Sequence, residues 1–388
     1  MYEIIAKTFA GLEQVLADEL KALGATGIRI IKRAVVFEGD TRMLYRANYE
    51  LRTALRILVP IHSFSAAREK DLYEGVRDID WSNYLQVSDT LAVDAVAQGE
   101  VFRHSQYVAL LTKDAIVDQF RDRYQRRPNV NTLSPGLRVN VHVLGNHCDI
   151  TLDATAGSLH RRNYRRDTVE APLNEVLAAG MVLLSEWNGL GPFVDPMCGS
   201  GTLAVEAALL ALRIPPQFMR EGFGFFKWPD FNRKTWESVK KEADGQALQG
   251  FEFPIIASDK DTRARNATAV NVLSAGLENV IQVEKMPFEK VQPPELPGTL
   301  LTNPPYDERL KLEDTAEFYH GIGDILKKNW PDWNAWLISS NREALKSVGL
   351  RPSKRITLFN GALECSFQKF ELYTGSRSKD GQPVIKMP

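Results

Sequence analysis

Residues 193–210 read FVDPMCGSGTLAVEAALL, and this stretch indicates the fold of the C-terminal half. A short apolar run ends at Asp195, a bend with two glycines follows, and an apolar helical pattern begins at Thr202. In an open parallel sheet, ligands bind beyond the carboxyl ends of the strands, where glycine lets the backbone turn sharply and approach a ligand closely. The bend suits an adenosine-containing ligand, although many strand–helix connections use glycine for turning alone. The GxGxxG and GxxxxGK[ST] motifs of dinucleotide and nucleoside triphosphate sites are absent from the sequence.

Beyond residue 160, short apolar runs alternate with helical patterns. Such alternation is typical of βαβ units and predicts an α/β fold, with a largely parallel sheet covered by helices on both faces. The last two apolar runs, 355–359 and 365–373, are separated by the turn-like NGALE and predict an antiparallel hairpin at the sheet edge. An aromatic-rich insertion at 215–236 interrupts the alternation, and its role cannot be assigned from the sequence.

The first 158 residues contain two smaller patterns of strands and helices. The first has a strand, a helix, a hairpin, a second helix and a strand, at residues 2–7, 11–24, 28–39, 41–55 and 56–64. The second has a strand, a helix and a hairpin, at residues 89–97, 105–125 and 138–154. We therefore expect two α+β modules before the α/β region, with a boundary near residues 55–60.

The composition is that of a globular protein of two or three domains. The chain has 388 residues, of which 44% are hydrophobic and 25% charged, and it lacks an apolar run long enough to cross a membrane. The N-terminus has acids where a signal peptide would need a basic flank, so we expect a soluble, cytoplasmic protein. The three cysteines are far apart and have no ligand-like spacing, which predicts neither a disulfide framework nor a metal site.

Arginine is concentrated at two places in a chain whose net charge is only −1. Because the overall charge does not attract a phosphate backbone, nucleic-acid affinity would have to come from such local clusters. The first cluster is formed by Arg121, Arg123, Arg126 and Arg127, and the second by Arg161, Arg162, Arg165 and Arg166. Taken alone, either cluster is as well explained by a solvated surface.

Two further strand ends carry polar residues. Asp259 ends the run IIASD, where its carboxylate could bind ribose hydroxyls or cap the following helix; Asp261 could serve as that cap equally well. Asn303 follows the run GTLLT and precedes Pro304, Pro305 and Tyr306. Because proline has no N–H to donate, this loop presents the Asn303 side chain and its own carbonyls as acceptors beside an aromatic ring.

This set of groups fits the methylation of an exocyclic base amine. The amine of guanine or adenine is conjugated with the ring, which makes its lone pair a poor nucleophile. The Asn303 side-chain oxygen and the Pro304 carbonyl could accept both amine hydrogens and favour tetrahedral nitrogen during attack on a sulfonium methyl group. Tyr306 would stack on a base that has been unstacked from its neighbours. A rigid surface turn is the alternative for the NPPY segment.

With DPMCGSGT, an acidic strand end and NPPY in this order, the C-terminal half resembles the class I Rossmann-like methyltransferases that modify amino groups. Nearly the whole chain, including AGSLHRRNYRR at 156–166, resembles the THUMP-domain 23S ribosomal RNA guanine-N2 methyltransferases. The resemblance implies a ferredoxin-like domain at 1–55, a THUMP RNA-binding domain at 56–158 and a methyltransferase domain with a seven-stranded, mostly parallel sheet at 159–388.

The resemblance also implies S-adenosylmethionine as the cofactor and ribosomal RNA as the partner. Asn303, Pro304, Pro305 and Tyr306 would hold the target base, and Asp259 would bind the ribose of the cofactor. The other residues that it places at the cofactor are Leu173, Asn174, Asp195, Pro196, Cys198, Gly199, Gly201, Thr202, Lys260, Met286, Phe288 and Asn303. RNA phosphates would be contacted by Arg123, Arg126, Arg127, Arg161, Arg162, Arg165 and Arg166.

The sequence departs from the family pattern at two positions. Asp307 stands where glycine often follows NPPY, which leaves the loop conformation open. The usual acidic residue at the end of the third strand is not obvious in VEKMPFEKV, so the adenine contact stays with Met286 or Phe288 as candidates.

Two other functions fit parts of the sequence. DNA adenine-N6 and protein glutamine methyltransferases also use a loop of the NPPY type, although the N-terminal modules argue against both. An RNA-binding ribosome assembly factor without catalysis is the third possibility, which the complete set of Asp195, Gly201 and the NPPY loop disfavours.

Overall fold

The computed structural model describes residues 1–169, 172–305, 312–374, 376–377 and 383–384. The chain forms two compact units. The N-terminal unit contains Met1–Thr8, Leu16–Arg161 and Arg220–Glu242, and the C-terminal unit contains Phe9–Val15, Arg162–Met219 and Ala243–Pro388. Within the described ranges, no helix has both the length and the apolar character needed to span a membrane.

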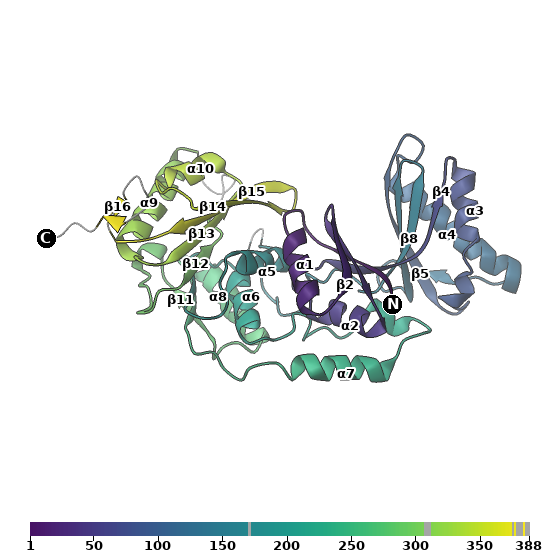
Figure 1. Cartoon of the computed structure of the whole chain (residues 1–388), viewed down its shortest axis with the longest axis horizontal. Helices are drawn as coiled ribbons and strands as arrows, with labels where there is room; N and C mark the ends of the chain where they lie inside the picture. Colours follow the sequence, from purple (N-terminus) through teal and green to yellow (C-terminus); the bar gives the residue numbers. More distant parts are fainter. Residues whose placement is uncertain (170–171, 306–311, 375, 378–382, 385–388) are drawn as a thin grey trace. The chain divides into compact units, whose positions relative to one another are not determined.

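An eight-stranded sheet forms the N-terminal unit, with the order β2-β3-β1-β4-β8-β7-β5-β6. Figure 1 labels β2, β4, β5 and β8 of this sheet. Its strands are β1 (Tyr2–Lys7), β2 (Thr26–Ile31), β3 (Ala34–Gly39), β4 (Arg56–Ser65), β5 (Thr90–Gln98), β6 (Asn129–Val130), β7 (Leu137–Leu144) and β8 (His147–Asp153). The accompanying helices are α1 (Glu13–Ala22), α2 (Thr41–Glu50), α3 (Glu69–Arg77), α4 (Ser105–Tyr124) and α7 (Arg233–Asp244). Helix α2 ends earlier than the sequence pattern predicts, because Leu51 is already extended.

The two predicted α+β modules share this single sheet. β4, which follows the predicted boundary, pairs with β1 on one side and with β8 on the other. The sequence patterns on either side of residue 55 are therefore joined by backbone hydrogen bonds, which hydrophobic periodicity does not reveal. The domain limits given above stay a prediction.

The aromatic insertion contributes part of the core of the N-terminal unit. Phe225 stacks on Tyr45 of α2 with ring centroids 4.4 Å apart, and Trp236 contacts Tyr49 edge to face at 5.4 Å. Gly224 lies against the backbone of β8, where a Cβ atom would come within 2.5 Å of the Asp153 carbonyl oxygen. The insertion therefore serves packing in a unit formed mainly by the first 161 residues.

A seven-stranded sheet forms the C-terminal unit, with the order β11-β10-β9-β12-β13-β15-β14. Its strands are β9 (Phe193–Asp195), β10 (Ile255–Asp259), β11 (Ile281–Lys285), β12 (Thr299–Thr302), β13 (Asn334–Ser339), β14 (Lys354–Asn360) and β15 (Leu363–Glu371). Its helices are α5 (Glu175–Leu184), α6 (Thr202–Ala211), α8 (Thr262–Ser274), α9 (Leu312–Asn329) and α10 (Arg342–Ser347). A separate two-stranded sheet joins β16 (Ser376–Arg377) to β17 (Pro383–Val384).

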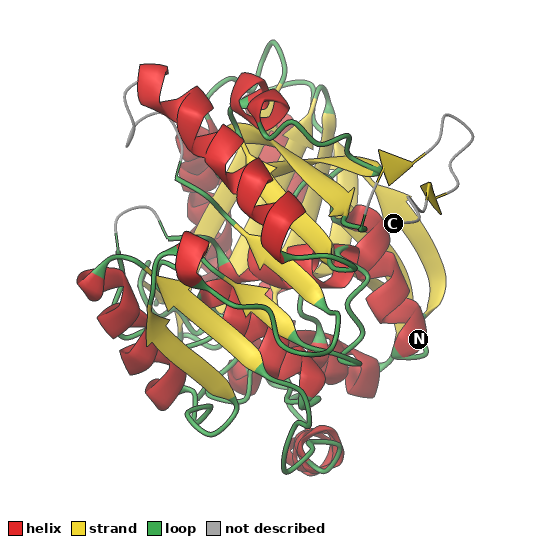
Figure 2. Cartoon of the chain, turned by 90° about the vertical axis from the view of Figure 1, so that its left-hand side faces the viewer, coloured by secondary structure: helices red, strands yellow, loops and turns green. Residues whose placement is uncertain are grey.

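The predicted parallel sheet and edge hairpin are both confirmed. The first five strands in the sheet order pair in parallel, whereas β15 pairs antiparallel with both β13 and β14. Side chains of α9 and α10 form a core with β12 and β13, while α6 and α8 contact β9, β10 and β11. Helices thus cover both faces of the sheet, as Figure 2 shows.

Candidate active site

The two motifs that the sequence singled out meet at one edge of the seven-stranded sheet. β9 and β12 are direct parallel neighbours, so their carboxyl ends lie side by side. A buried hydrogen bond joins these ends, because Thr302 Oγ1 at the end of β12 donates to Asp195 Oδ1 at the end of β9 over 2.9 Å. The bend after Asp195 and the Asn-Pro-Pro segment after Thr302 therefore border the same space.

Glycine is required in the bend for a steric reason. Gly199 and Gly201 have φ values of +56° and +80°, which residues with a Cβ atom rarely adopt. A Cβ atom on Gly201 would also approach Thr268 Cγ2 to 2.7 Å. The bend thus presents its backbone closely both to α8 and to the space in front of the sheet.

Asp259 fixes the bend from the neighbouring strand β10. One of its carboxylate oxygens accepts a hydrogen bond from the Gly199 N–H over 3.0 Å, and the other accepts from the Asp261 N–H over 2.9 Å. Asp261 is the residue that caps α8, by accepting from the Arg263 N–H. Between the two alternatives, the cap therefore belongs to Asp261, and Asp259 links β10 to the bend.

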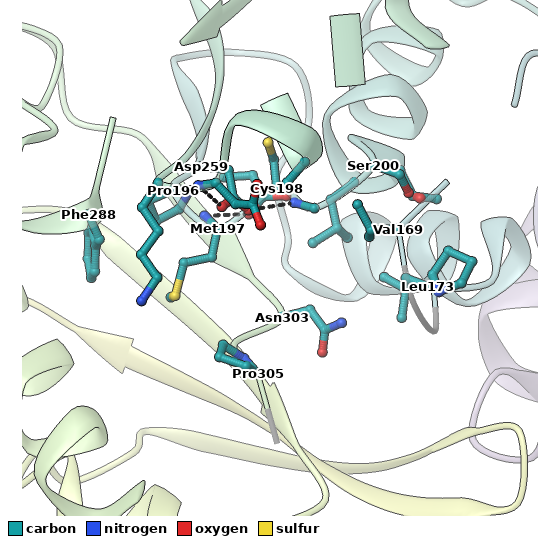
Figure 3. Close-up of a pocket in the computed structure, with 18 of the residues that line it drawn as sticks. Val169, Leu173, Pro196, Met197, Cys198, Ser200, Asp259, Phe288, Asn303 and Pro305 are labelled. Carbon is teal, nitrogen blue, oxygen red and sulfur yellow. Dashed lines mark hydrogen bonds between the residues drawn. The ribbon is translucent and has the colours of Figure 1, made fainter. Parts of the chain in front are cut away.

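A cavity of about 750 Å³ opens at this edge of the sheet. Figure 3 shows Asn303 and Pro305 across the cavity from Met197 and Cys198. Eleven of the residues predicted for the site line it: Leu173, Asp195, Pro196, Cys198, Gly199, Thr202, Asp259, Lys260, Phe288, Asn303 and Pro305. The volume falls within the range of pockets that hold drug-sized ligands, which is about 300–1,000 Å³.

Four predicted residues lie beside the cavity without lining it. The Asn174 side chain caps α5 by accepting from the Val176 and Leu177 N–H groups. Gly201 is the N-cap of α6, and Met286 packs against the hydrophobic core that includes side chains of α9. Pro304 is buried, and its two neighbours in the sequence, Asn303 and Pro305, line the cavity. Tyr306 and Asp307 lie outside the described residues.

Several residues that line the cavity were not predicted as site residues. They are Val169, Pro172, Met197, Ser200, Leu203, Asp261, Arg263, Ala264, Glu289 and Phe318. Met197 and Ser200 lie in the glycine bend between Asp195 and Gly201, and this position in the sequence is a signal that would have identified them. Glu289 provides an acidic group after the third strand, four residues later than the strand end at Lys285. Phe318 comes from α9, and no sequence signal connects that helix to the bend.

Burial dominates the electrostatics of the site. Asp195 is 1% exposed, and this desolvation raises its pKa to about 7, although hydrogen bonds from Thr302 and the Met197 N–H act in the opposite direction. The negative charge of Asp259 adds to the increase. Burial also raises the pKa of the Cys198 thiol well above its usual value. Burial at this edge of the sheet therefore favours the neutral forms of both the Asp195 carboxyl group and the Cys198 thiol.

Two arginines predicted to contact RNA have other partners. Arg162 has no exposed surface, and its Nε lies 3.5 Å from Glu206 Oε1. In this position the side chain faces a buried carboxylate, whereas the sequence analysis predicted a contact with an RNA phosphate. The Arg165 side chain is only 17% exposed and pairs with Glu175. A burial pattern of this kind cannot be read from a run of basic residues, because it depends on carboxylates of α5 and α6.

The remaining arginines are on the surface. Arg161 and Arg166 are exposed, and Arg166 Nε donates to Ser274 Oγ over 3.3 Å. At the end of α4, Arg121 pairs with Asp118 and Arg123 pairs with Asp80, whereas Arg126 and Arg127 are exposed beyond the helix. Positive charge thus gathers at the C-terminus of α4, where the helix dipole favours it.

Family models match three consecutive parts of the chain. The RlmL ferredoxin-like domain matches residues 3–58, the THUMP domain matches 66–153, and the RMKL-like methyltransferase domain matches 162–369. The third match covers more than half of the 388 residues.

Two curated relatives match over almost the whole of this chain. A Synechocystis protein, whose name proposes an RNA methyltransferase, is 39% identical over 94% of this chain and 95% of its own length. The ribosomal RNA large subunit methyltransferase K/L of Syntrophotalea carbinolica is 37% identical over 93% of this chain. This chain spans about half of the length of that relative, 52%.

Solved structures of similar proteins share the complete architecture. SMU.472, proposed to be a methyltransferase and crystallised with S-adenosylhomocysteine, is 30% identical with a TM-score of 0.86, over 97% of this chain and 99% of its own. A Listeria monocytogenes protein predicted to be an N6-adenine-specific DNA methylase is 28% identical with a TM-score of 0.85, over 95% and 96%. On the strength of these matches, the chain belongs to the family of RMKL-like methyltransferase domains, joined here to a ferredoxin-like and a THUMP domain.

Proposed function

We propose that this protein transfers a methyl group from S-adenosylmethionine to the exocyclic N2 amine of a guanine in ribosomal RNA. The observation that carries the proposal is the meeting of the glycine bend and the Asn-Pro-Pro segment at one cavity, tied by the Thr302–Asp195 hydrogen bond. The names of the K/L relatives support ribosomal RNA as the substrate class. Such a substrate implies a cytoplasmic reaction.

The cavity fits an adenosine-containing cofactor. Gly199 lines the cavity with a φ of +56°, which glycine adopts readily, so backbone without a side chain borders this part of the cavity. The Asp259 carboxylate lies at the adjacent strand end, Phe288 supplies an aromatic ring, and Leu173 supplies an apolar surface. We assign the ribose to Asp259, the adenine region to Phe288 and Glu289, and the methionine end to Leu173.

The bound cofactor would supply a methyl group on a positively charged sulfur, which becomes a neutral thioether as the methyl group leaves. The residues of this chain would prepare the nucleophile. Asn303 would accept one hydrogen of the guanine N2 amine and the Pro304 carbonyl the other, which localises the lone pair on nitrogen. Nitrogen held in this way would bond to the methyl carbon as the C–S bond breaks, and its surplus proton would then pass to water. No strong base is required in this scheme.

The preceding modules would deliver the RNA. We assign the ferredoxin-like domain to 1–55, the THUMP domain to 56–158 and the methyltransferase domain to 159–388, with Arg123, Arg126 and Arg127 on phosphates. Arg161 and Arg166, which are exposed, complete the proposed RNA contacts.

The test uses the complete chain and S-adenosylmethionine with a labelled methyl group. Ribosomal RNA, genomic DNA and protein extract are offered separately, and the nucleosides of labelled RNA are identified by mass spectrometry. We expect label in ribosomal RNA as N2-methylguanosine. Label in DNA as N6-methyladenine would support the activity named for the Listeria relative instead, and label only in protein would indicate a glutamine methyltransferase. Calorimetry without cofactor binding would revive the assembly-factor alternative.

A further inference from the structure

Arg165 lies behind the wall of the cavity and connects two parts of that wall. Its Nη2 donates to the Leu173 carbonyl oxygen over 2.7 Å and to Thr202 Oγ1 over 3.0 Å. Leu173 precedes α5 and Thr202 begins α6, and both residues line the cavity. One nitrogen atom therefore links the entrance of α5 to the first turn of α6.

The guanidinium is also held by a buried carboxylate. Arg165 Nε lies 3.0 Å from Glu175 Oε1, in the first turn of α5, where the Glu175 side chain is 8% exposed. Burial raises the pKa of Glu175, and the positive charge of Arg165 acts against that increase. The planar guanidinium fixes the direction of Nη2 toward the carbonyl and hydroxyl oxygens while Nε lies beside the carboxylate, and an ammonium group lacks this fixed geometry.

A second ion pair holds the same segment, residues 162–166. Arg162 Nε faces Glu206 on α6, and Tyr164 donates its hydroxyl to the same Glu206 oxygen over 3.1 Å. Both Arg162 and Tyr164 are buried. The side chains of Arg162, Tyr164 and Arg165 thus attach this segment to α5 and α6.

We propose that Arg165 is a positioning residue for the cofactor: by tying Leu173 to Thr202, it sets the separation of the two cavity walls that contact S-adenosylmethionine. This inference rests on the proposed function, because it takes the cavity to be the cofactor site. Arg165 acts through Leu173 and Thr202 and is not among the residues that line the cavity.

The test measures the affinity of the complete chain for S-adenosylhomocysteine by calorimetry, for the wild-type protein, Arg165→Lys, Thr202→Val and Arg342→Lys. Arg165→Lys keeps a positive charge opposite Glu175, so the buried carboxylate retains a partner. Thr202→Val removes the hydroxyl acceptor with little change in volume. Arg342→Lys is the matched control in the same unit, because Arg342 is exposed and pairs with Glu364 at the surface.

We expect Arg165→Lys to weaken S-adenosylhomocysteine binding about tenfold, the loss typical of one charged hydrogen bond, and Thr202→Val to weaken it by a smaller factor. In turnover assays, the KM for S-adenosylmethionine should rise, while kcat at saturating cofactor and the KM for RNA stay within about twofold of wild type. A merely structural role would lower the fraction of active protein and kcat instead. The control should match the wild type.

Three results would count against the inference in different ways. Wild-type protein that does not bind S-adenosylhomocysteine would overturn the proposed function and this inference together. If the wild type binds S-adenosylhomocysteine and both Arg165→Lys and Thr202→Val bind it with the same affinity, only the proposed role of Arg165 would be overturned. Unchanged cofactor affinity with a weaker, less salt-dependent RNA complex in Arg165→Lys would return Arg165 to the RNA contacts predicted from the sequence.

Discussion

Asn303 is the residue on which the proposed chemistry depends most directly. It lines the cavity immediately after Thr302, whose side chain is fixed on Asp195. Asn303→Ala should lower kcat by about 10²- to 10³-fold, the effect of losing one directed hydrogen-bonding group in a transition state. The affinity for S-adenosylhomocysteine, measured by calorimetry, should change little. A large drop in that affinity would mean that Asn303 holds the cofactor instead of the base.

Asp195 gives the folded protein a specific pH dependence. Its pKa in the folded state is about 7 because the carboxyl group is buried, whereas the ordinary value, expected for the unfolded chain, is 3.8. The folded state therefore binds this proton more tightly, and the associated stabilisation is complete below pH 4 and declines as the pH rises toward 7.

The measurement compares unfolding free energies of wild type and Asp195→Asn between pH 4 and pH 8, without cofactor. Asparagine keeps an oxygen acceptor for Thr302 and the Met197 N–H but does not ionise. The stability of the wild type relative to the variant should fall across pH 4–7 and level off above it. A pH-independent difference would show that Asp195 ionises in the folded state as readily as in the unfolded chain.

Arg162 and Arg165 show the limit of sequence interpretation for single residues. Both stand in a run of arginines that resembles a phosphate-binding segment, yet their partners are Glu206 and Glu175 in two helices that follow later in the chain. A carboxylate on a helix gives no sign in the sequence of which arginine it will meet, because the pairing depends on the packing of α5 and α6. Asp195 and Asn303 were predictable, since parallel strands place their carboxyl ends at one edge.

At the scale of single elements, most helices and strands followed from hydrophobic periodicity. Among the described helices, α3, α7 and α10 have no counterpart in the patterns that the sequence analysis identified. α10 has six residues, and α7 begins inside the aromatic insertion at 215–236, for which the sequence analysis assigned no structure. Short helices carry too few apolar positions to establish a period, and their stability comes mainly from tertiary contacts.

Two glycines of α9 make a matched pair for testing the packing of this element. A Cβ atom on Gly323 would lie 1.8 Å from the Val348 carbonyl oxygen at the end of α10, whereas a Cβ atom on Gly321 would have no neighbour within 4 Å. Gly323→Ala should destabilise the protein by about 1–3 kcal/mol through overpacking, and Gly321→Ala should stabilise it by about 0.5–1 kcal/mol through helix propensity. Denaturant unfolding measures both values. Equal effects of the two substitutions would contradict the close approach of α9 and α10.

At the scale of the whole molecule, RNA affinity should depend on the exposed arginines beyond α4. Replacing Arg126 and Arg127 by Gln should weaken binding to ribosomal RNA and reduce the slope of log K against log salt by about 1.4–1.8, since each lost phosphate contact accounts for about 0.7–0.9. Arg29→Gln is the control for the loss of a positive charge. Arg29 lies on β2 of the same unit and pairs with Glu3 on β1. A filter-binding titration at several salt concentrations gives the slope. An unchanged slope in the double variant would remove these arginines from the RNA contacts.

The composition of the two units was not foreseeable from the order of the chain. Residues 9–15 belong to the C-terminal unit and 220–242 to the N-terminal unit, so each unit contains a segment from the sequence region of the other. The aromatic rings of the second segment pack on Tyr45 and Tyr49, which precede them by almost half of the chain. Apolar composition indicates that such a segment will be buried, but it does not indicate by which surface.

The sequence by itself determined the α/β character of the C-terminal half, the order of its strands and helices, and the strand ends that carry Asp195, Asp259 and Asn303. These features depend on local periodicity and on the common direction of parallel strands. Both can be inferred from the pattern of residues along the chain. Only the tertiary structure decided that the first eight strands form one sheet, that the aromatic insertion completes its core, and that Arg162 and Arg165 are held by Glu206 and Glu175. Those outcomes depend on which surfaces and charges meet after folding, and the free energy of such contacts comes from residues far apart in the chain.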